Sequence, residues 1–392
     1  MDEHRITSRR TALVVGAGIG GLAAGIALGR AGWRVKIFER AAEIRPFGFG
    51  LGLAPNAIAA LRELGIVERV MAEASSVRQV EIRTSGGKIL KRFNLAADRA
   101  DAVPAFTLRP ALHQALLDAI PPGAISPASD AAAFAPAGSR VLLTFQDGRS
   151  EVGDILIGAD GIDSTIRKLL HPEEGPPDRS GYFAIRGVAH NAASCLAGLS
   201  AAAYLGRGIE AATVRASGDS VYWYVSLLSE DAPRMVVAPE IMLQRCAALF
   251  DDGFRRVVEA TTAENVRLDE LFDRTPISGW GAGPVTLMGD AAHPMLPHTG
   301  QGAAQALEDA VALGLVLEAT NDPAASLRRY EQVRASRTRA IVKRGPRIAG
   351  FTTTKSLLIN ALRGAAIRLM PSRAAAAGFL LARGSDPHRA LR

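Results

Sequence analysis

A chain of 392 residues is long enough for two or three folding units around a large core. Its 48% hydrophobic and 22% charged residues are typical of a globular protein and argue against extensive disorder. The formal charge of +7 favours anionic ligands, but the sequence has no zinc-finger spacing and no basic segment interleaved with aromatic residues, which excludes the common nucleic-acid-binding modules.

The chain contains two cysteines, Cys195 and Cys246. Thiols so far apart in sequence indicate neither a disulfide framework nor a metal site, so we predict no metal and a reducing, cytoplasmic compartment. Near the N-terminus, basic "RITSRR" followed by apolar "TALVVGAGIGGLAAGIALG" resembles a signal peptide. Its glycines are spaced for a turn and charges resume in "RAGWRVKIFER", so we favour a folded segment over a secretion signal.

The first motif is a βαβ unit near the start of the chain. "TALVVG" predicts a buried strand, "GAGIGGLAAGIALGRAG" a helix, and "WRVKIFE" a second strand. Gly16, Gly18 and Gly21 have G-x-G-x-x-G spacing, which serves a tight turn, a close approach to a pyrophosphate, and helix packing on the sheet. Glu39 ends the second strand, where a carboxylate bonds ribose hydroxyls and disfavours a 2′-phosphate. The unit predicts the adenosine of FAD or NAD and leaves that choice open.

The next segments alternate helices and strands. "PNAIAALRELGIVERVM" predicts a helix, "VRQVEIRTSGGKILKRFNL" an antiparallel hairpin, and "LRPALHQALLDAI" a helix with Pro110 in its first turn. "SRVLLTFQDGRSEVGDILIGAD" predicts two strands joined at Asp147 and Gly148. Asp160 and Ser164 follow, between the second strand and a helix. From the residues alone, capping of that helix and ligand binding are equally supported.

Residues 181–275 predict an antiparallel sheet with covering helices, inserted before the nucleotide-binding pattern returns at "GPVTLMGDAAH". "SVYWYVSLL" places Tyr222 and Tyr224 on one face of a strand and Trp223 on the other. Tyr222 is our candidate for substrate contact, although packing of the sheet onto its helices explains these aromatics equally well. Arg186 and His190 are weaker candidates for binding a substrate carboxylate or deprotonating a phenol.

A second glycine-rich segment, "GPVTLMGDAAHPMLPHTGQGAAQALEDAVALGLVL", repeats the order strand, turn, helix. Its helix is expected to begin near Ala303, and the amide-rich N-terminus suits a second electronegative group. A rigid structural loop is the alternative. We expect His293 to support the loop and assign no chemistry to His298.

After about residue 341 the chain is basic, alanine-rich and helical. "FTTTKSLLINALRGAAIRLMPSR" is compatible with an amphipathic helix on a membrane. We favour packing of this tail on the cofactor domain, and expect neither membrane association nor a nucleic-acid partner. The expected oligomeric state is a monomer or a homodimer.

Together, "GAGIGGL…FER", "LRPALHQAL", "GADGIDSTIR" and "GDAAHPMLPHTGQGAAQALEDA" resemble the motifs of the single-component flavoprotein aromatic hydroxylases, which have the para-hydroxybenzoate hydroxylase fold. The resemblance implies an α/β protein: a Rossmann-like FAD-binding domain, an inserted mixed or antiparallel β-sheet substrate domain, and C-terminal helices. We assign residues 8–78, 106–180 and 276–340 to a discontinuous FAD-binding domain, 79–105 and 181–275 to the substrate domain, and 341–392 to a C-terminal helical region.

The resemblance also implies how a noncovalent FAD is held. The first glycine turn would approach the pyrophosphate, Glu39 the adenosine ribose, and Asp290 the ribityl chain or pyrophosphate. The late turn would present backbone amides to the flavin, where the helix dipole favours the anionic reduced ring. The cofactor-binding residues so implied are Gly16, Gly18, Gly20, Gly21, Glu39, Arg40, Gly50, Gly52, Arg109, Asp160, Asp290, Gly300, Gln301, Gly302 and Ala303. Tyr222 and Pro297 are the candidates for the pocket between flavin and substrate.

The implied activity is hydroxylation of an aromatic or heteroaromatic small molecule with NAD(P)H and O2, through a flavin C4a-hydroperoxide. The cofactor would carry the chemistry, which agrees with a sequence that has no readable catalytic triad. A related flavin-dependent epoxidase or reductase, acting on an isoprenoid or polyketide-like substrate, is the alternative. Two glycine motifs nearly three hundred residues apart then predict one long cofactor, FAD, and NAD(P)H as a transient co-substrate.

Overall fold

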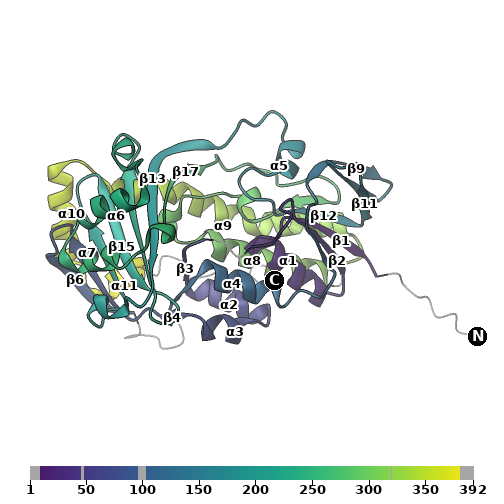
Figure 1. Ribbon diagram of the computed structural model, residues 1–392. Coiled ribbons are helices and arrows are strands. Elements are labelled where there is room, and N and C mark those ends of the chain that lie inside the picture. Colours follow the sequence, from purple (N-terminus) through teal and green to yellow (C-terminus); the bar gives the residue numbers. More distant parts are fainter. Residues whose placement is uncertain (1–8, 46–47, 96–102, 319, 380–392) are drawn as a thin grey trace, which may run out of the picture.

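The computed structural model describes residues 9–45, 48–95, 103–318 and 320–379 (Figure 1). Residues 5–8 of the basic N-terminal segment and residues 46–47, shortly before Gly50, lie outside the described residues. Within them, the Rossmann-like parallel sheet, the separate mixed sheet and the C-terminal helices predicted from the sequence are confirmed.

A five-stranded sheet positions both glycine motifs. Its order is β18 (Val285–Leu287), β12 (Ile155–Gly158), β1 (Thr11–Val15), β2 (Arg34–Phe38) and β8 (Ile125–Ser126), with every neighbouring pair parallel. The central strands are almost fully buried, which explains their continuous apolar runs. Helix α1 (Ile19–Arg30) follows β1 and packs on α8 (Gly302–Leu317), so the two turns begin helices that lie side by side.

The second unit is a seven-stranded mixed sheet. Its order is β17 (Val266–Asp273), β13 (Asp178–Ala189), β16 (Val221–Leu228), β15 (Ile209–Arg215), β14 (Ala201–Leu205), β5 (Gln79–Thr84) and β6 (Ile89–Asn94). The pairing of β14 with β5 is parallel and recruits the early hairpin to this sheet. Helices α6 (Pro239–Ala247) and α7 (Asp252–Glu259) cover one face, where the Trp223 ring lies 5.9 Å from the Phe254 ring. We propose that this unit is the substrate domain.

Smaller elements connect these units. One small sheet contains β3 (Gly50–Leu53), β7 (Ala105–Leu108) and β4 (Ser75–Ser76), and another contains β9 (Ala131–Ala137), β10 (Arg140–Phe145) and β11 (Ser150–Gly153). The remaining short helices are α3 (Val67–Ala72), α4 (Arg109–Leu117), α5 (Thr165–Leu170) and α2 (Pro55–Glu63). The single helix predicted over "PNAIAALRELGIVERVM" is instead two, α2 and α3, because the chain turns at Gly65 with φ +74°.

The C-terminal helices differ most from the prediction. Helix α9 (Pro323–Thr352) continues through residue 341, where the sequence suggested a boundary. Helices α10 (Leu357–Leu369) and α11 (Ser372–Phe379) pack on β6, the edge strand of the seven-stranded sheet (Figure 1). The expectation that the tail packs on the cofactor domain is therefore wrong. In the described part of the chain, no helix combines the length and apolar character needed to cross a membrane.

Candidate functional site

The three glycines of the first turn have different surroundings. Gly16 has φ +104°, and a Cβ on it would lie 2.4 Å from the Ala159 carbonyl oxygen. A Cβ on Gly21 would lie 1.8 Å from the Gly16 carbonyl oxygen. The fold itself therefore requires both. A Cβ on Gly18 would meet no atom within 4 Å, and Gly18 is the N-cap of α1 without a side-chain cap, so space stays open beside the first-turn amides.

Two side chains hold this turn through the backbone of Ala17. Glu39 accepts a hydrogen bond from the Ala17 amide at 2.8 Å, and its other oxygen accepts one from the Ala41 amide at 3.0 Å. The buried His113 Nε2 lies 2.8 Å from the Ala17 carbonyl oxygen, to which it donates. Burial lowers the pKa of His113, which favours the neutral ring. Sequence reasoning missed His113, although its spacing of four residues from Arg109 on α4 places both on one helix face.

The second glycine segment lies against the first. A Cβ on Gly20 would lie 3.5 Å from side-chain atoms of both Ala306 in α8 and Met288 after β18. A Cβ on Gly302 would lie 3.9 Å from an Asp290 carboxylate oxygen. The turn after β1 and the start of α8 thus border one region, as a single cofactor reaching both would require.

Asp290 carries an accessible carboxylate in this region, within the turn η5 (Gly289–Ala291). Although Asp290 reaches the surface, the surrounding protein desolvates its carboxylate and raises its pKa, whereas His293 and Arg109 oppose that effect. Burial also lowers the pKa of Arg109, and Asp290 opposes this in turn. Two predicted cofactor residues, from α4 and from the late loop, are therefore close enough to interact electrostatically.

The late loop uses some of its amides internally. In η6 (Pro297–Thr299) and the turn that follows, Gly300 donates to the Pro297 carbonyl at 2.8 Å and has φ +62°. The Gln301 amide lies 3.3 Å from the Thr299 hydroxyl oxygen, and the Gln301 side chain is buried. The amides of Gly302 and Ala303 are therefore the main groups of this loop that could contact a flavin, and that contact stays a prediction.

Buried charges beneath the loop fix its position. Asp309 accepts hydrogen bonds from the Gly289 amide at 2.9 Å and from His293 Nε2 at 2.6 Å, and Arg334 Nε donates to its other oxygen at 2.7 Å. Burial opposes ionisation of Asp309, but His293 and Arg334 outweigh burial and hold its pKa at about 2. Arg334 also pairs with Glu308 at 2.5 Å. These contacts give His293 the loop-supporting position that the sequence favoured.

Asp160 caps a helix. One carboxylate oxygen accepts from the Thr165 amide at 2.7 Å, and the other accepts from the Ser164 hydroxyl at 2.5 Å. Ser164 in turn accepts from the Arg167 amide at 2.9 Å. The sequence left open whether Asp160 and Ser164 cap the helix or bind a ligand, and the structure shows the capping contacts. Contact between Asp160 and the cofactor stays a prediction. Arg167, which sequence reasoning did not single out, donates to the carbonyls of Ala291 and Ala292 and joins this segment to the late loop.

Tyr222 lies where the small β3–β7 sheet meets the seven-stranded sheet. Its ring stacks on Phe106 with centroids 5.3 Å apart. A Cβ on Gly50 would lie 2.4 Å from both rings, so this packing alone excludes a side chain at Gly50. Burial raises the pKa of Tyr222 and keeps its hydroxyl protonated. Arg186, a weaker substrate candidate, is paired with Asp269 at 2.5 Å.

A buried polar cluster on the same sheet face was missed by sequence reasoning. His298 Nε2 lies 2.9 Å from the Ser226 hydroxyl oxygen and 3.6 Å from a Glu210 carboxylate oxygen. His298 Nδ1 has no hydrogen-bond partner among the described residues. Burial lowers the pKa of His298 to about 4 and raises that of Glu210 to about 7. The available signal was Glu210 itself, a carboxylate within the apolar strand "IEAATV".

Glu210→Gln is expected to change the pH dependence of stability. Burial raises the pKa of Glu210 from 4.5 to about 7, despite opposition from Thr352 and Arg363, so between these values the folded chain holds a proton that the unfolded chain has lost. Stability therefore falls as pH rises through this window, by about 3 kcal/mol in total. Urea unfolding at pH 4 and pH 8 should show that the free energy of unfolding of the variant rises relative to that of the wild type only at the higher pH.

The matched control for this prediction is Glu230→Gln, which removes a carboxylate that is 65% exposed in its side chain. Its stability difference from wild type should be nearly the same at both pH values. A Glu210→Gln difference that does not grow with pH would contradict a protonated, buried Glu210.

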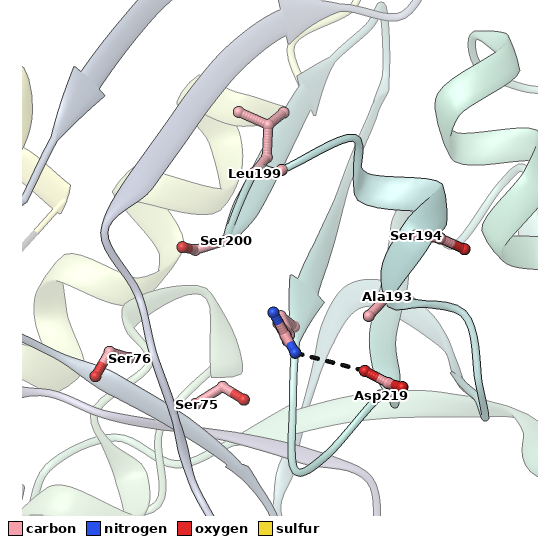
Figure 2. Close-up of a pocket in the computed structure, with 9 residues that line it drawn as sticks. Ser75, Ser76, Ala193, Ser194, Leu199, Ser200 and Asp219 are labelled. Carbon is pink, nitrogen blue, oxygen red and sulfur yellow. Dashed lines mark hydrogen bonds and ion pairs between the residues drawn. The ribbon is translucent and has the colours of Figure 1, made fainter.

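A separate pocket of about 490 Å³ is lined by β4 and by the segments around Ser194, Ser200 and Asp219. Figure 2 shows Ser75, Ser200 and Asp219 among the residues around it. Asp219 pairs with Arg215, which also lines the pocket, at 3.4 Å. Both partners of that pair are about half exposed or more, and none of the predicted site residues lines the pocket. We assign it no function.

Comparisons with known proteins find chains of similar sequence and fold. A family model described as FAD binding domain matches residues 9–345. The chain is 35% identical over 355 residues to a 3-amino-4-hydroxybenzoate 2-monooxygenase of Streptomyces platensis, covering 87% of this chain and 88% of the relative. It is 30% identical to the aurachin C monooxygenase/isomerase of Stigmatella aurantiaca, covering 92% and 94%. The fold is similar, with a TM-score of 0.88, 24% identity and coverage of 97% and 98%, to that of Klebsiella pneumoniae HpxO crystallised with FAD and uric acid.

Proposed function

The chain belongs to the FAD binding domain family and is an FAD-dependent enzyme, and from this premise we propose that it hydroxylates an aromatic or heteroaromatic small molecule with NAD(P)H and O2. The observation that carries the cofactor site is the convergence of its two glycine motifs. One region is bordered by three groups: the α1 amides with the open space beside them, the Arg109 guanidinium, and the Asp290 carboxylate. These groups fit an extended dinucleotide: amides and an arginine for phosphates, and a carboxylate for hydroxyl groups.

Each group has a role in holding the cofactor. The α1 amides and Arg109 would bind the pyrophosphate, Glu39 the adenosine ribose, and Asp290 the ribityl hydroxyls. Gly302 and Ala303, at the positive end of the α8 dipole, would face the flavin ring. When bound, the flavin supplies hydride acceptance from NAD(P)H and activation of O2. The protein's part is to position the substrate and to exclude water.

The substrate side is proposed to lie on the seven-stranded sheet face that carries Tyr222. The stacked Phe106 and Tyr222 rings offer an apolar wall for an aromatic ring. Pro297 is exposed and begins η6, which ends one residue before Gly300. It is therefore a candidate for the lining of the substrate pocket. A hydroxyl or amino group of the substrate placed at His298 would meet an uncharged imidazole whose Nδ1 has no partner among the described residues and can accept a hydrogen bond.

The test is a substrate screen that measures coupling. Phenols, aromatic acids and heteroaromatic compounds are each incubated with the FAD-loaded enzyme, NADH or NADPH and O2, and nucleotide consumption is compared with product formed. We expect at least one aromatic compound to accelerate NAD(P)H oxidation and to gain one hydroxyl oxygen from O2. Product formation without O2 uptake would contradict a monooxygenase. Conversion of an isoprenoid alkene to an epoxide, with no aromatic substrate accepted, would replace hydroxylation by the alternative function.

A further inference from the structure

Helix α10 turns its large apolar side chains outward. Leu358, Leu362 and Leu369 are 68%, 60% and 84% exposed. Their spacing, with the exposed Ala365 between the last two, places them along one face of the helix. A solvent-facing leucine stripe on a helix reverses the arrangement expected for a globular protein, where the apolar face is buried.

The inward side of α10 is held by an arginine. Arg363 is buried and donates hydrogen bonds to the carbonyls of Phe351 at 2.8 Å, Thr352 at 2.6 Å and Gly206 at 3.1 Å. Ile367 is buried on the same side. Rotating the helix to bury its leucines would break these hydrogen bonds and leave the three carbonyls without this donor. The outward direction of the leucine stripe is therefore fixed by the fold.

The surroundings of the stripe are basic. Residues 332–379 contain ten lysines and arginines and no aspartate or glutamate, although Arg334, Arg337 and Lys355 are paired with carboxylates from other segments. Arg368 on α10 is exposed, as are Arg344 and Arg347 near the end of α9, where Phe351 is itself 51% exposed. An apolar stripe on a helix with an exposed arginine, in a basic segment and too short to span a bilayer, is the arrangement of an interfacial helix.

Contrary to the expectation from the sequence, we propose that α10 docks on an anionic lipid surface, with its leucine stripe at the acyl boundary and exposed arginines at the lipid phosphates. The charges favour this occupant over two others. A second copy of the chain would bring basic faces together. Residues 380–392, with three arginines and one aspartate, would add further positive charge. The proposal is independent of the substrate and of the reaction.

The test uses the full-length, FAD-loaded chain and vesicles of phosphatidylcholine, with or without phosphatidylglycerol. We expect co-sedimentation with the phosphatidylglycerol vesicles, weakened by added salt because the arginines contribute. Leu358→Gln combined with Leu362→Gln should reduce binding at least tenfold, because two apolar side chains that would insert into the lipid are lost. The matched control is Leu169→Gln combined with Leu249→Gln, which alters two exposed leucines outside α10 and should bind as wild type. Both double variants should retain FAD and unfold in a single cooperative thermal transition.

Three results would overturn the proposal. One is wild-type protein that stays in the supernatant with phosphatidylglycerol vesicles, and another is equal binding by the two double variants. The third is a dimer, seen by light scattering, that the α10 variant dissociates while neither protein binds vesicles, which would assign the stripe to a second copy. If instead the wild type fails to bind and a chain ending at residue 379 binds, the C-terminal segment is the occupant.

Discussion

Gly18→Val is expected to abolish FAD binding, raising Kd by roughly 100-fold or more, while the apoprotein folds normally. Gly18 has φ −74° and ψ −177°, a conformation open to any residue, and a Cβ there meets no protein atom within 4 Å. The fold therefore tolerates the valine. The new side chain would fill the space through which a pyrophosphate reaches the first-turn amides of α1. FAD titration by fluorescence and the Tm of the apoprotein measure the two effects separately.

Gly29→Val is the control for this experiment. Gly29 also belongs to α1, and a Cβ there likewise meets no atom within 4 Å, but it lies at the opposite end of the helix. Its variant should bind FAD as the wild type does. If Gly18→Val retained wild-type affinity, the open space beside α1 would not be the pyrophosphate site.

Arg334→Ala is expected to lower the free energy of unfolding by about 3–5 kcal/mol. The arginine is 2% exposed and lies between Asp309 and Glu308, at 2.7 and 2.5 Å. Its removal would leave two buried carboxylates without their principal counter-ion, and the cost of an uncompensated buried charge is large. Because Asp309 also holds His293 and the Gly289 amide, the loss should reach the late loop and weaken FAD binding as well.

Arg337→Ala separates this effect from a general loss of positive charge. Arg337 also contacts Glu308, at 3.1 Å, but its side chain is 22% exposed and does not reach Asp309 in the contacts described. We expect a loss of about 1 kcal/mol or less. Urea unfolding of the two apoproteins makes the comparison, and equal losses would show that the buried position of Arg334 is unimportant.

The parts of the site that follow from local backbone geometry could be predicted from the sequence. Gly16 needs positive φ and Gly21 needs contact with the preceding turn, and both requirements act within a few residues. Alternation along β16 likewise placed Trp223 and Tyr222 on opposite faces. The supporting side chains could not be predicted, because their partners come from distant segments: His113 reaches Ala17, and Arg167 reaches Ala291. The hydrophobic periodicity of these segments does not predict such a contact.

Helix α10 shows the same limit. Its sequence predicts an amphipathic helix, yet the pattern cannot say which face is buried. That is decided by Gly206, in the turn between β14 and β15, and by Phe351 at the end of α9, both of which accept hydrogen bonds from Arg363. The parallel pairing of β14 with β5, which completes the sheet beneath this helix, also joins segments more than a hundred residues apart. Long-range pairing of this kind leaves no local signal.

The central claim is that two glycine motifs, distant in sequence, bind one FAD molecule. The most direct measurement reconstitutes the wild-type chain with FAD, removes free flavin by gel filtration, and determines flavin and adenine per chain before and after denaturation. The account predicts one FAD per folded chain, all of it released on denaturation because its contacts are noncovalent. Two bound nucleotides per chain would make the motifs separate sites, and a well-folded chain that retains no FAD would contradict the account as a whole.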